Sequence, residues 1–75
     1  MVKIYSTPTC PYCEMAKEYF KEHNINYEDY DVSNDENAQK EMLAKSHQMA
    51  VPVIDIDGTI IIGFNRAEID KILKL

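Results

Sequence analysis

Several residue types are scarce in this sequence, and each shortage narrows the class of protein. The chain has no tryptophan, two glycines, three prolines and two cysteines among its 75 residues. So little glycine and proline is not typical of a disordered or low-complexity chain. No apolar run approaches the roughly 20 residues needed to cross a bilayer, and residues 1–5 lack the apolar core and cleavage site of a signal peptide. We therefore expect a cytoplasmic protein with no membrane partner, in which a purely structural disulfide is unusual.

Basic residues are also scarce. Eight lysines and arginines stand against 13 aspartates and glutamates, which gives a formal net charge of −5. A nucleic-acid-binding surface needs clustered lysine and arginine, so we expect no nucleic-acid partner. A chain of 75 residues predicts a single domain, residues 1–75. Such a domain hides about 60% of its unfolded surface, so the core is small and the active site lies at its edge.

Local patterns predict seven elements in the order βαβαββα. Residues 2–6 are β-branched and aromatic, which favours a strand, and Asp57-Gly58 is a strong hairpin signal. The predicted strands are 2–6, 27–32, 51–56 and 59–62, and the predicted helices are 11–24, 36–46 and 66–74. Apolar spacing of three and four predicts the inward-facing residues Met15, Ala16, Tyr19, Phe20, His23, Ala38, Met42, Leu43, Ile69, Ile72 and Leu73.

This order of elements indicates the fold class. A strand–helix–strand unit is right-handed and its strands are parallel, whereas two strands joined by a two-residue turn are antiparallel. Burying all seven elements then requires an α/β fold with a four-stranded mixed sheet and helices on both faces. That is the thioredoxin-type architecture.

The two cysteines lie where the first strand ends and the first helix begins. The thiolate is the reactive form of cysteine, and the first turn of a helix stabilises negative charge through unpaired N–H groups and the helix dipole. We therefore expect a lowered pKa at Cys10 and assign it as the nucleophile. Residues three apart on a helix are close enough for a disulfide, so Cys13 is assigned as the resolving thiol.

A zinc site is the main alternative for a Cys-x-x-Cys pair. Zinc normally takes four ligands, and His23 and His47 are the other candidates in the chain. His23 lies roughly 15 Å from Cys13 at the helical rise per residue, which makes a site within one chain unfavourable. The position of the motif in a strand–helix–strand unit favours redox chemistry and no metal site, with metal binding or an inert pair as the alternatives.

Four segments resemble the glutaredoxin family. Residues 9–13 (Thr-Cys-Pro-Tyr-Cys) contain the dithiol glutaredoxin motif Cys-Pro-Tyr-Cys, and Ala16-Lys17 follows at the family's spacing. Residues 48–52 (Gln-Met-Ala-Val-Pro) resemble its Gln-Arg-Thr-Val-Pro segment, and Gly63 falls where the family has Gly-Gly. The resemblance spans essentially the whole chain. It implies a monomeric electron-transport protein that reduces protein disulfides or glutathione mixed disulfides, with glutathione as co-substrate and no tightly bound cofactor.

The resemblance also implies roles around the cysteines. Base rates favour a trans bond before Pro52, but in glutaredoxins this proline is cis and faces the cysteine pair. The preceding residue, Val51, offers its backbone to a bound peptide or glutathione, and Asn65 begins a helix whose N-terminus suits a glutathione carboxylate. The residues expected to bind glutathione or substrate are Tyr12, Gln48, Val51, Pro52, Gly63, Phe64 and Asn65.

Three positions depart from the family pattern. Thr7 replaces a common lysine, Ala50 replaces the threonine before Val-Pro, and Arg66 stands where an aspartate commonly meets the glutathione ammonium. A first alternative is therefore a glutaredoxin-like redoxin that thioredoxin reductase reduces, acting on a ribonucleotide reductase or a peroxidase. A second is a [2Fe–2S] protein in which two chains share a cluster through Cys10 and glutathione.

Overall fold

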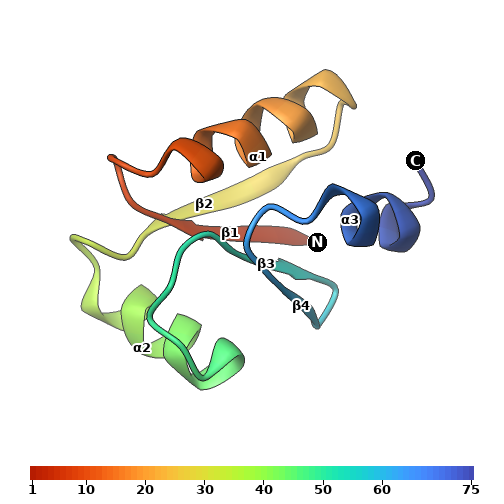
Figure 1. Ribbon diagram of the computed structural model, residues 1–75. Coiled ribbons are helices and arrows are strands. Elements are labelled where there is room, and N and C mark those ends of the chain that lie inside the picture. The colour runs from red at the N-terminus through yellow and green to blue at the C-terminus, as the bar shows by residue number, and fades with distance from the viewer.

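The computed structural model describes all residues, 1–75, and contains the predicted seven elements in the order βαβαββα (Figure 1). They are β1 (Val2–Ser6), α1 (Pro11–Glu22), β2 (Tyr27–Asp31), α2 (Glu36–Ser46), β3 (Val53–Ile56), β4 (Thr59–Ile62) and α3 (Arg66–Leu73). None of the three helices combines the length and the apolar character needed to cross a lipid bilayer.

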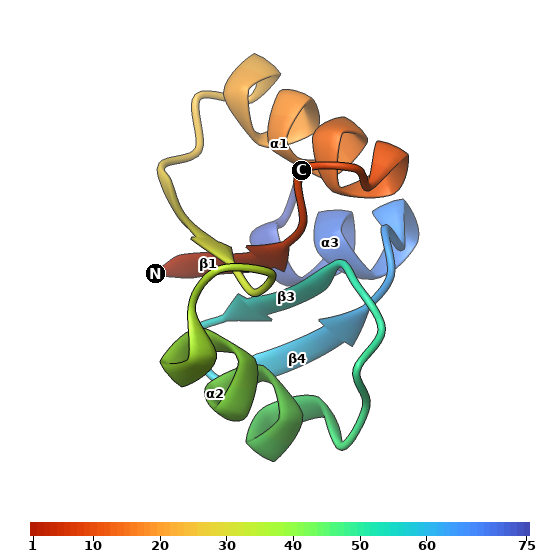
Figure 2. The same ribbon diagram turned by 90° about the vertical axis from the view of Figure 1, so that its left-hand side faces the viewer.

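The four strands form one mixed sheet in the order β2-β1-β3-β4. Strand β1 pairs with β2 in parallel and with β3 antiparallel, and β3 pairs antiparallel with β4. Helices α1 and α3 cover one face of the sheet and α2 covers the other (Figure 2). The predicted thioredoxin fold, with a four-stranded mixed sheet and helices on both faces, is confirmed.

Most element ends agree with the sequence prediction within one residue, and two do not. Strand β3 begins at Val53 rather than at residue 51. Pro52 has no N–H to give to a strand ladder, and its carbonyl accepts the Gly63 N–H at 2.8 Å. Helix α1 ends at Glu22 because Asn24 has a φ of 56°, a left-handed conformation that stops a helix.

Each face of the sheet carries its own apolar cluster. The cluster under α1 and α3 comprises Val2, Ile4, Ala16, Tyr19, Phe20, Ile54, Ile56, Ile61 and Ile69. The cluster under α2 comprises Tyr5, Val32, Ala38, Met42 and Val53. Strand β1 contributes to both, since successive side chains of a strand point to opposite faces.

Three residues expected to face inward are exposed instead: Met15, His23 and Leu43. The buried stripe of α1 passes through Cys13, and Met15, two positions later, points about 200° away around the helix axis. His23 lies beyond the last residue of α1. Leu43 follows the buried Met42 by one position, about 100° around the axis.

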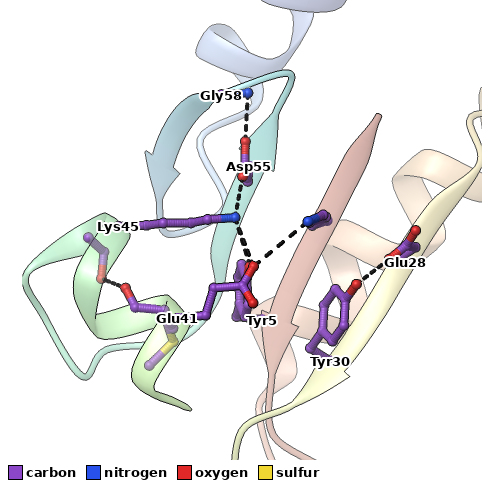
Figure 3. A network of polar contacts seen from close by, with 10 residues as sticks. Tyr5, Glu28, Tyr30, Glu41, Lys45, Asp55 and Gly58 are labelled. Carbon is purple, nitrogen blue, oxygen red and sulfur yellow. Dashed lines mark hydrogen bonds and ion pairs between the residues drawn. The ribbon is translucent and has the colours of Figure 1, made fainter. Parts of the chain in front are cut away.

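A network of polar side chains fastens α2 to the sheet (Figure 3). The Lys45 ammonium lies 2.6 Å from Asp55 Oδ2, donates to the Tyr5 hydroxyl over 2.9 Å and lies 3.1 Å from Glu41 Oε1. The Tyr5 hydroxyl donates to Glu41 over 2.5 Å, and the Gly58 N–H donates to Asp55 Oδ1 over 2.8 Å. Every carboxylate in the network therefore has a donor.

The network shifts the ionisation of its members. Burial acts to raise the pKa of Asp55, but the hydrogen bonds from Lys45 and Gly58 outweigh it and leave that pKa below its ordinary value. The hydrogen bonds from Tyr5 and Lys45 lower the pKa of Glu41. Burial and the Glu41 carboxylate raise the pKa of Tyr5 to about 12. The ionised carboxylates and the neutral phenol are thus the stable forms at neutral pH.

We expect Lys45→Met to destabilise the fold by about 2–4 kcal/mol, because Asp55, whose side chain is 10% exposed, would lose its cation. Lys40→Met, on the exposed side of the same helix, removes the same charge and is expected to cost under about 0.5 kcal/mol. Urea unfolding at pH 7 measures both. A lowered native pKa stabilises the fold above the unfolded pKa, and this contribution is lost as pH falls through the native pKa. The Lys45→Met penalty should therefore shrink below about pH 4, and a penalty that stays constant would contradict this account.

Candidate active site

The first turn of α1 sets the geometry of the cysteine pair. Cys10 is the N-cap, with extended φ and ψ of −100° and 107°. Pro11 occupies the first helical position, where its missing N–H costs nothing. The Cys13 N–H donates to Cys10 Sγ over 3.2 Å. A sulfur here faces a backbone donor and the positive end of the helix dipole, the environment that favours a thiolate.

The two sulfurs are joined as a disulfide, with the Cα atoms 5.2 Å apart. Their exposure differs sharply, because Cys13 is fully enclosed while Cys10 is half-buried. A disulfide substrate approaching from solvent therefore meets Cys10 before Cys13. The arrangement supports one accessible thiol for attack and one enclosed thiol for resolution.

The sheet register brings the other predicted residues to the same edge. Tyr5 pairs with Val53, and Val53 pairs with Ile62, so the ends of β1 and β4 meet the beginning of β3. The loops that leave this edge are residues 7–10, 47–52 and 63–65. With the first turn of α1, these segments hold every site residue that the sequence predicts.

Residues 51 and 52 have the conformation that the resemblance implied. The Val51–Pro52 peptide bond is cis, and Pro52 is fully buried. Val51 is half-buried, and its N–H and C=O make no hydrogen bond to the rest of the protein. An unpaired backbone next to a strand is suited to pair with an added extended peptide.

Two of the residues predicted to bind glutathione or substrate have exposed side chains. The Tyr12 side chain lies between the cysteines in sequence and is 62% exposed. Gln48 is exposed in the loop between α2 and Val51, and its N–H donates to the Ser46 hydroxyl over 3.2 Å. Both side chains are free to meet a ligand, and neither is held by a contact to the cysteines.

The start of α3 borders the site together with the cysteine loop and residues 47–52. Gly63 has a φ of 80°, in the left-handed region that glycine adopts readily. Asn65 is the N-cap and accepts the Glu68 N–H over 3.2 Å. The Arg66 guanidinium lies 4.9 Å from the centre of the Tyr19 ring, in a shallow groove of about 190 Å³ that Phe64 also lines. A cation thus stands at the helix start.

Sequence reasoning missed a group of polar side chains that contact one another between α1 and the sheet. Ser6 donates to Asp29 over 2.8 Å, and the Lys17 ammonium lies 2.8 Å from the other Asp29 oxygen. Serine at a strand end and aspartate in an exposed-looking strand carry no distinctive local pattern. The contact joins positions 23 residues apart, so the sequence offered no signal for it.

The structure has no group of three or more His, Cys, Asp or Glu side chains arranged to hold a metal ion. His23, the nearer zinc candidate in sequence, packs its ring against Tyr19 with the ring centres 4.5 Å apart.

Comparison with known proteins identifies relatives along the whole chain. Residues 2–61 match the Glutaredoxin family. An uncharacterized glutaredoxin-like 8.6 kDa protein in the rubredoxin operon of Clostridium pasteurianum is 55% identical over 74 residues, covering 99% of both chains. Glutaredoxin 3 of Escherichia coli K12 is 30% identical and covers 97% of this chain and 96% of its own. The glutaredoxin-like protein NrdH of Lactococcus lactis is 35% identical and covers 96% of this chain and 99% of its own.

Solved structures agree on the fold. The thioredoxin-like protein BC3987 superposes with a TM-score of 0.89 at 31% identity, covering 95% of this chain and 97% of its own. The NrdH-redoxin of Escherichia coli superposes with a TM-score of 0.83 at 20% identity, covering 93% and 91%. The family match and these relatives identify the chain as a member of the glutaredoxin family, with a Cys-x-x-Cys dithiol on a thioredoxin fold.

Proposed function

We propose that this protein is a thiol–disulfide oxidoreductase that reduces protein disulfides and glutathione mixed disulfides, with glutathione as its reductant. One observation carries the proposal: Cys10 and Cys13 form a disulfide at the start of α1, with Cys10 half-buried and Cys13 enclosed. Structural disulfides are seldom built this way, because the accessible sulfur sits at a helix N-terminus that favours its thiolate.

The reaction divides into two exchanges and a recovery. The Cys10 thiolate attacks one sulfur of the substrate disulfide, forms a mixed disulfide and releases the other sulfur as a thiolate. Cys13, as a thiolate, then attacks Cys10 Sγ, closes the Cys10–Cys13 disulfide and releases the reduced substrate. Two glutathione thiols recover the dithiol and leave as glutathione disulfide, so two electrons pass from glutathione to the substrate.

The edge around the cysteines offers a matching substrate groove. The free N–H and C=O of Val51 are suited to pair with an extended substrate backbone as an added strand. The N-terminus of α3, capped by Asn65, suits a glutathione carboxylate. Tyr12, Gln48, Pro52, Gly63 and Phe64 complete the proposed groove.

A second candidate reductant, thioredoxin reductase, is favoured by two positions around the site. Arg66 places a guanidinium at the start of α3, where a carboxylate would be needed to attract the glutathione ammonium. Thr7 likewise provides no cation beside the cysteines. Identities to Glutaredoxin 3 and to NrdH are similar, at 30% and 35%, so the residues at positions 7 and 66 are the feature that distinguishes the two candidates.

Single-cysteine variants test the roles of the two thiols. We expect Cys10→Ser to reduce activity to background with every substrate, because the attacking sulfur is gone. Cys13→Ser should lose the reduction of protein disulfides but keep the reduction of glutathione mixed disulfides, since that exchange needs one thiol. The measurement is turnover of a glutathionylated peptide and of a protein disulfide. Greater damage from Cys13→Ser in the one-thiol reaction would reverse the assignment.

The reductant is decided by NADPH oxidation with a small disulfide in two parallel assays. One contains glutathione and glutathione reductase, and the other contains thioredoxin reductase alone. We expect turnover in the glutathione assay. Turnover confined to the thioredoxin reductase assay would identify thioredoxin reductase as the reductant and leave the proposed dithiol chemistry intact. No turnover in either assay would overturn the proposed oxidoreductase activity.

Exchange of the charge at Arg66 tests whether this cation repels the glutathione ammonium. We expect Arg66→Asp to lower the KM for glutathione by roughly fivefold, since removing a repulsive cation and adding a carboxylate near an exposed ammonium is worth about 1 kcal/mol. Lys71→Asp, exposed in the last turn of α3, makes the same charge change away from the site and should leave KM unchanged. The effect should fade in high salt, and an equal response of both variants would assign it to net charge.

A further inference from the structure

Ser46 is a polar residue on the face of α2 that packs against the sheet. The buried residues of this helix are Ala38, Met42 and Ser46, spaced four apart and therefore on one face. Ser46 is 6% exposed, at a position where an amphipathic helix ordinarily carries an apolar side chain. Packing alone does not account for a serine here, and the function proposed above does not use it.

The Ser46 hydroxyl contacts the loop that leaves α2. It accepts the Gln48 N–H over 3.2 Å. It also lies 2.9 Å from the Gln48 carbonyl oxygen and 2.8 Å from the Met42 carbonyl oxygen. A hydroxyl has one proton, so it donates to one of these carbonyls at a time. Both backbone polar groups of Gln48 therefore meet the same buried side chain.

The last turn of α2 fixes where this hydroxyl lies. The Lys45 ammonium lies 2.6 Å from Asp55 Oδ2 and fastens this turn to β3 (Figure 3). His47 then leaves the helix with a φ of 61°, in the left-handed region that ends helices. Its N–H donates to the Leu43 carbonyl over 2.8 Å. Ser46 is thus a fixed point from which the loop begins.

The loop is held at two points and is free between them. At its far end the Pro52 carbonyl accepts the Gly63 N–H over 2.8 Å, and Pro52 is fully buried. Residues 49–51 lie between Gln48 and Pro52, and their backbone groups make no hydrogen bond to the rest of the protein. Holding both ends of so short a span limits the positions that its unpaired backbone adopts.

We propose that Ser46 is a positioning residue for substrate binding, because its hydroxyl holds Gln48 and so orders the loop that presents the Val51 backbone. The inference rests on the proposed dithiol function, and the ligand that benefits is a substrate with a glutathionyl or peptide segment. An ordered loop loses less conformational freedom when a ligand pairs with it. Without the hydroxyl, the exposed Gln48 bonds to water instead, and the loop gains freedom that binding must remove.

This role distinguishes disulfides by whether they carry a peptide segment. A disulfide with a glutathionyl group gains from the ordered loop, whereas a disulfide without peptide bonds has no backbone to pair with Val51. The sulfur of Cys10 is capped within the first turn of α1, so its reactivity does not depend on Ser46. The hydroxyl therefore acts on the choice of substrate and not on the attacking thiol.

Rapid mixing of the reduced protein with two nitrobenzoate disulfides measures this effect. One is the symmetric disulfide, and the other joins glutathione to the same aromatic thiol. With the mixed disulfide, the Cys10 thiolate bonds to the glutathione sulfur, the S–S bond breaks and the coloured aromatic thiolate leaves, because it is the weaker base of the two. The symmetric disulfide releases the same coloured thiolate, so one absorbance reports the first exchange with both substrates.

We expect Ser46→Ala to lower the second-order rate constant for the mixed disulfide by about fivefold, the effect of one hydrogen bond of ordinary strength. The rate constant for the symmetric disulfide should not change. Where the rate saturates, the half-saturating concentration of the mixed disulfide should rise and the maximal rate should stay the same, as lost binding requires. Ser46→Thr, which keeps the hydroxyl, should keep the wild-type ratio of the two rate constants.

Asp35→Ala is the matched control for a general loosening of α2. Asp35 is the N-cap of this helix and accepts the N–H groups of Asn37 and Ala38, so its loss destabilises the same helix from the end away from the loop. Urea unfolding at pH 7 gives the stability of each variant. The ratio of the two rate constants should stay at the wild-type value in Asp35→Ala and fall in Ser46→Ala.

An equal loss of rate with both disulfides in Ser46→Ala would overturn the inference and assign Ser46 to the stability of the fold alone. An unchanged rate with the mixed disulfide would also overturn it, as would the same fall of the ratio in Asp35→Ala or in Ser46→Thr. Absence of any release from the wild type would instead remove Cys10 as nucleophile and overturn the proposed function, and the inference with it.

Discussion

Strand β1 is the constraint on which the rest of the structure depends. It is central in the sheet, between β2 and β3, and its two faces supply Ile4 to one apolar cluster and Tyr5 to the other. Neighbouring strands cover both edges of β1 and helices cover both of its faces, so the chain is free of neighbours only at the two ends of the strand. The chain leaves it into the cysteine loop, and the parallel and antiparallel registers of its neighbours decide which other loops meet there.

The start of α1 then makes the two cysteines of the same motif unlike. Cys10 is the N-cap and stays half-buried, while Cys13, one turn later, joins the stripe that packs on the sheet. A spacing of three is short enough for a disulfide, with the Cα atoms 5.2 Å apart, yet it places Cys10 before the helix and Cys13 within its first turn. The accessible and enclosed sulfurs thus follow from where the helix begins, and shifting that start by one residue would lose the distinction.

Local sequence patterns predicted the features of the fold that depend on residues close together in the sequence. The Asp57-Gly58 turn, the Asn65 cap and the order of the elements follow from backbone preferences that reside in the residues themselves. The exposure of Met15 was missed because a helical repeat leaves the edge of its buried stripe undefined. The contacts of Lys45 with Asp55 and of Ser6 with Asp29 depend on register and helix placement. A single sequence carries no periodic signal for a polar pair between separate elements.

The two polar networks lie on opposite faces of the sheet. The Lys45 network is formed on the α2 face, where the Lys45 ammonium contacts Tyr5, Asp55 and Glu41. The Asp29 network is formed on the α1 face and has one carboxylate that is 40% exposed and one hydroxyl that is almost fully buried. Each network joins a hydroxyl from β1 to a partly exposed carboxylate and a lysine ammonium. Because both hydroxyl-bearing residues are buried, leaving either carboxylate without its partners would cost stability, so each network is suited to holding a helix on its face of the sheet.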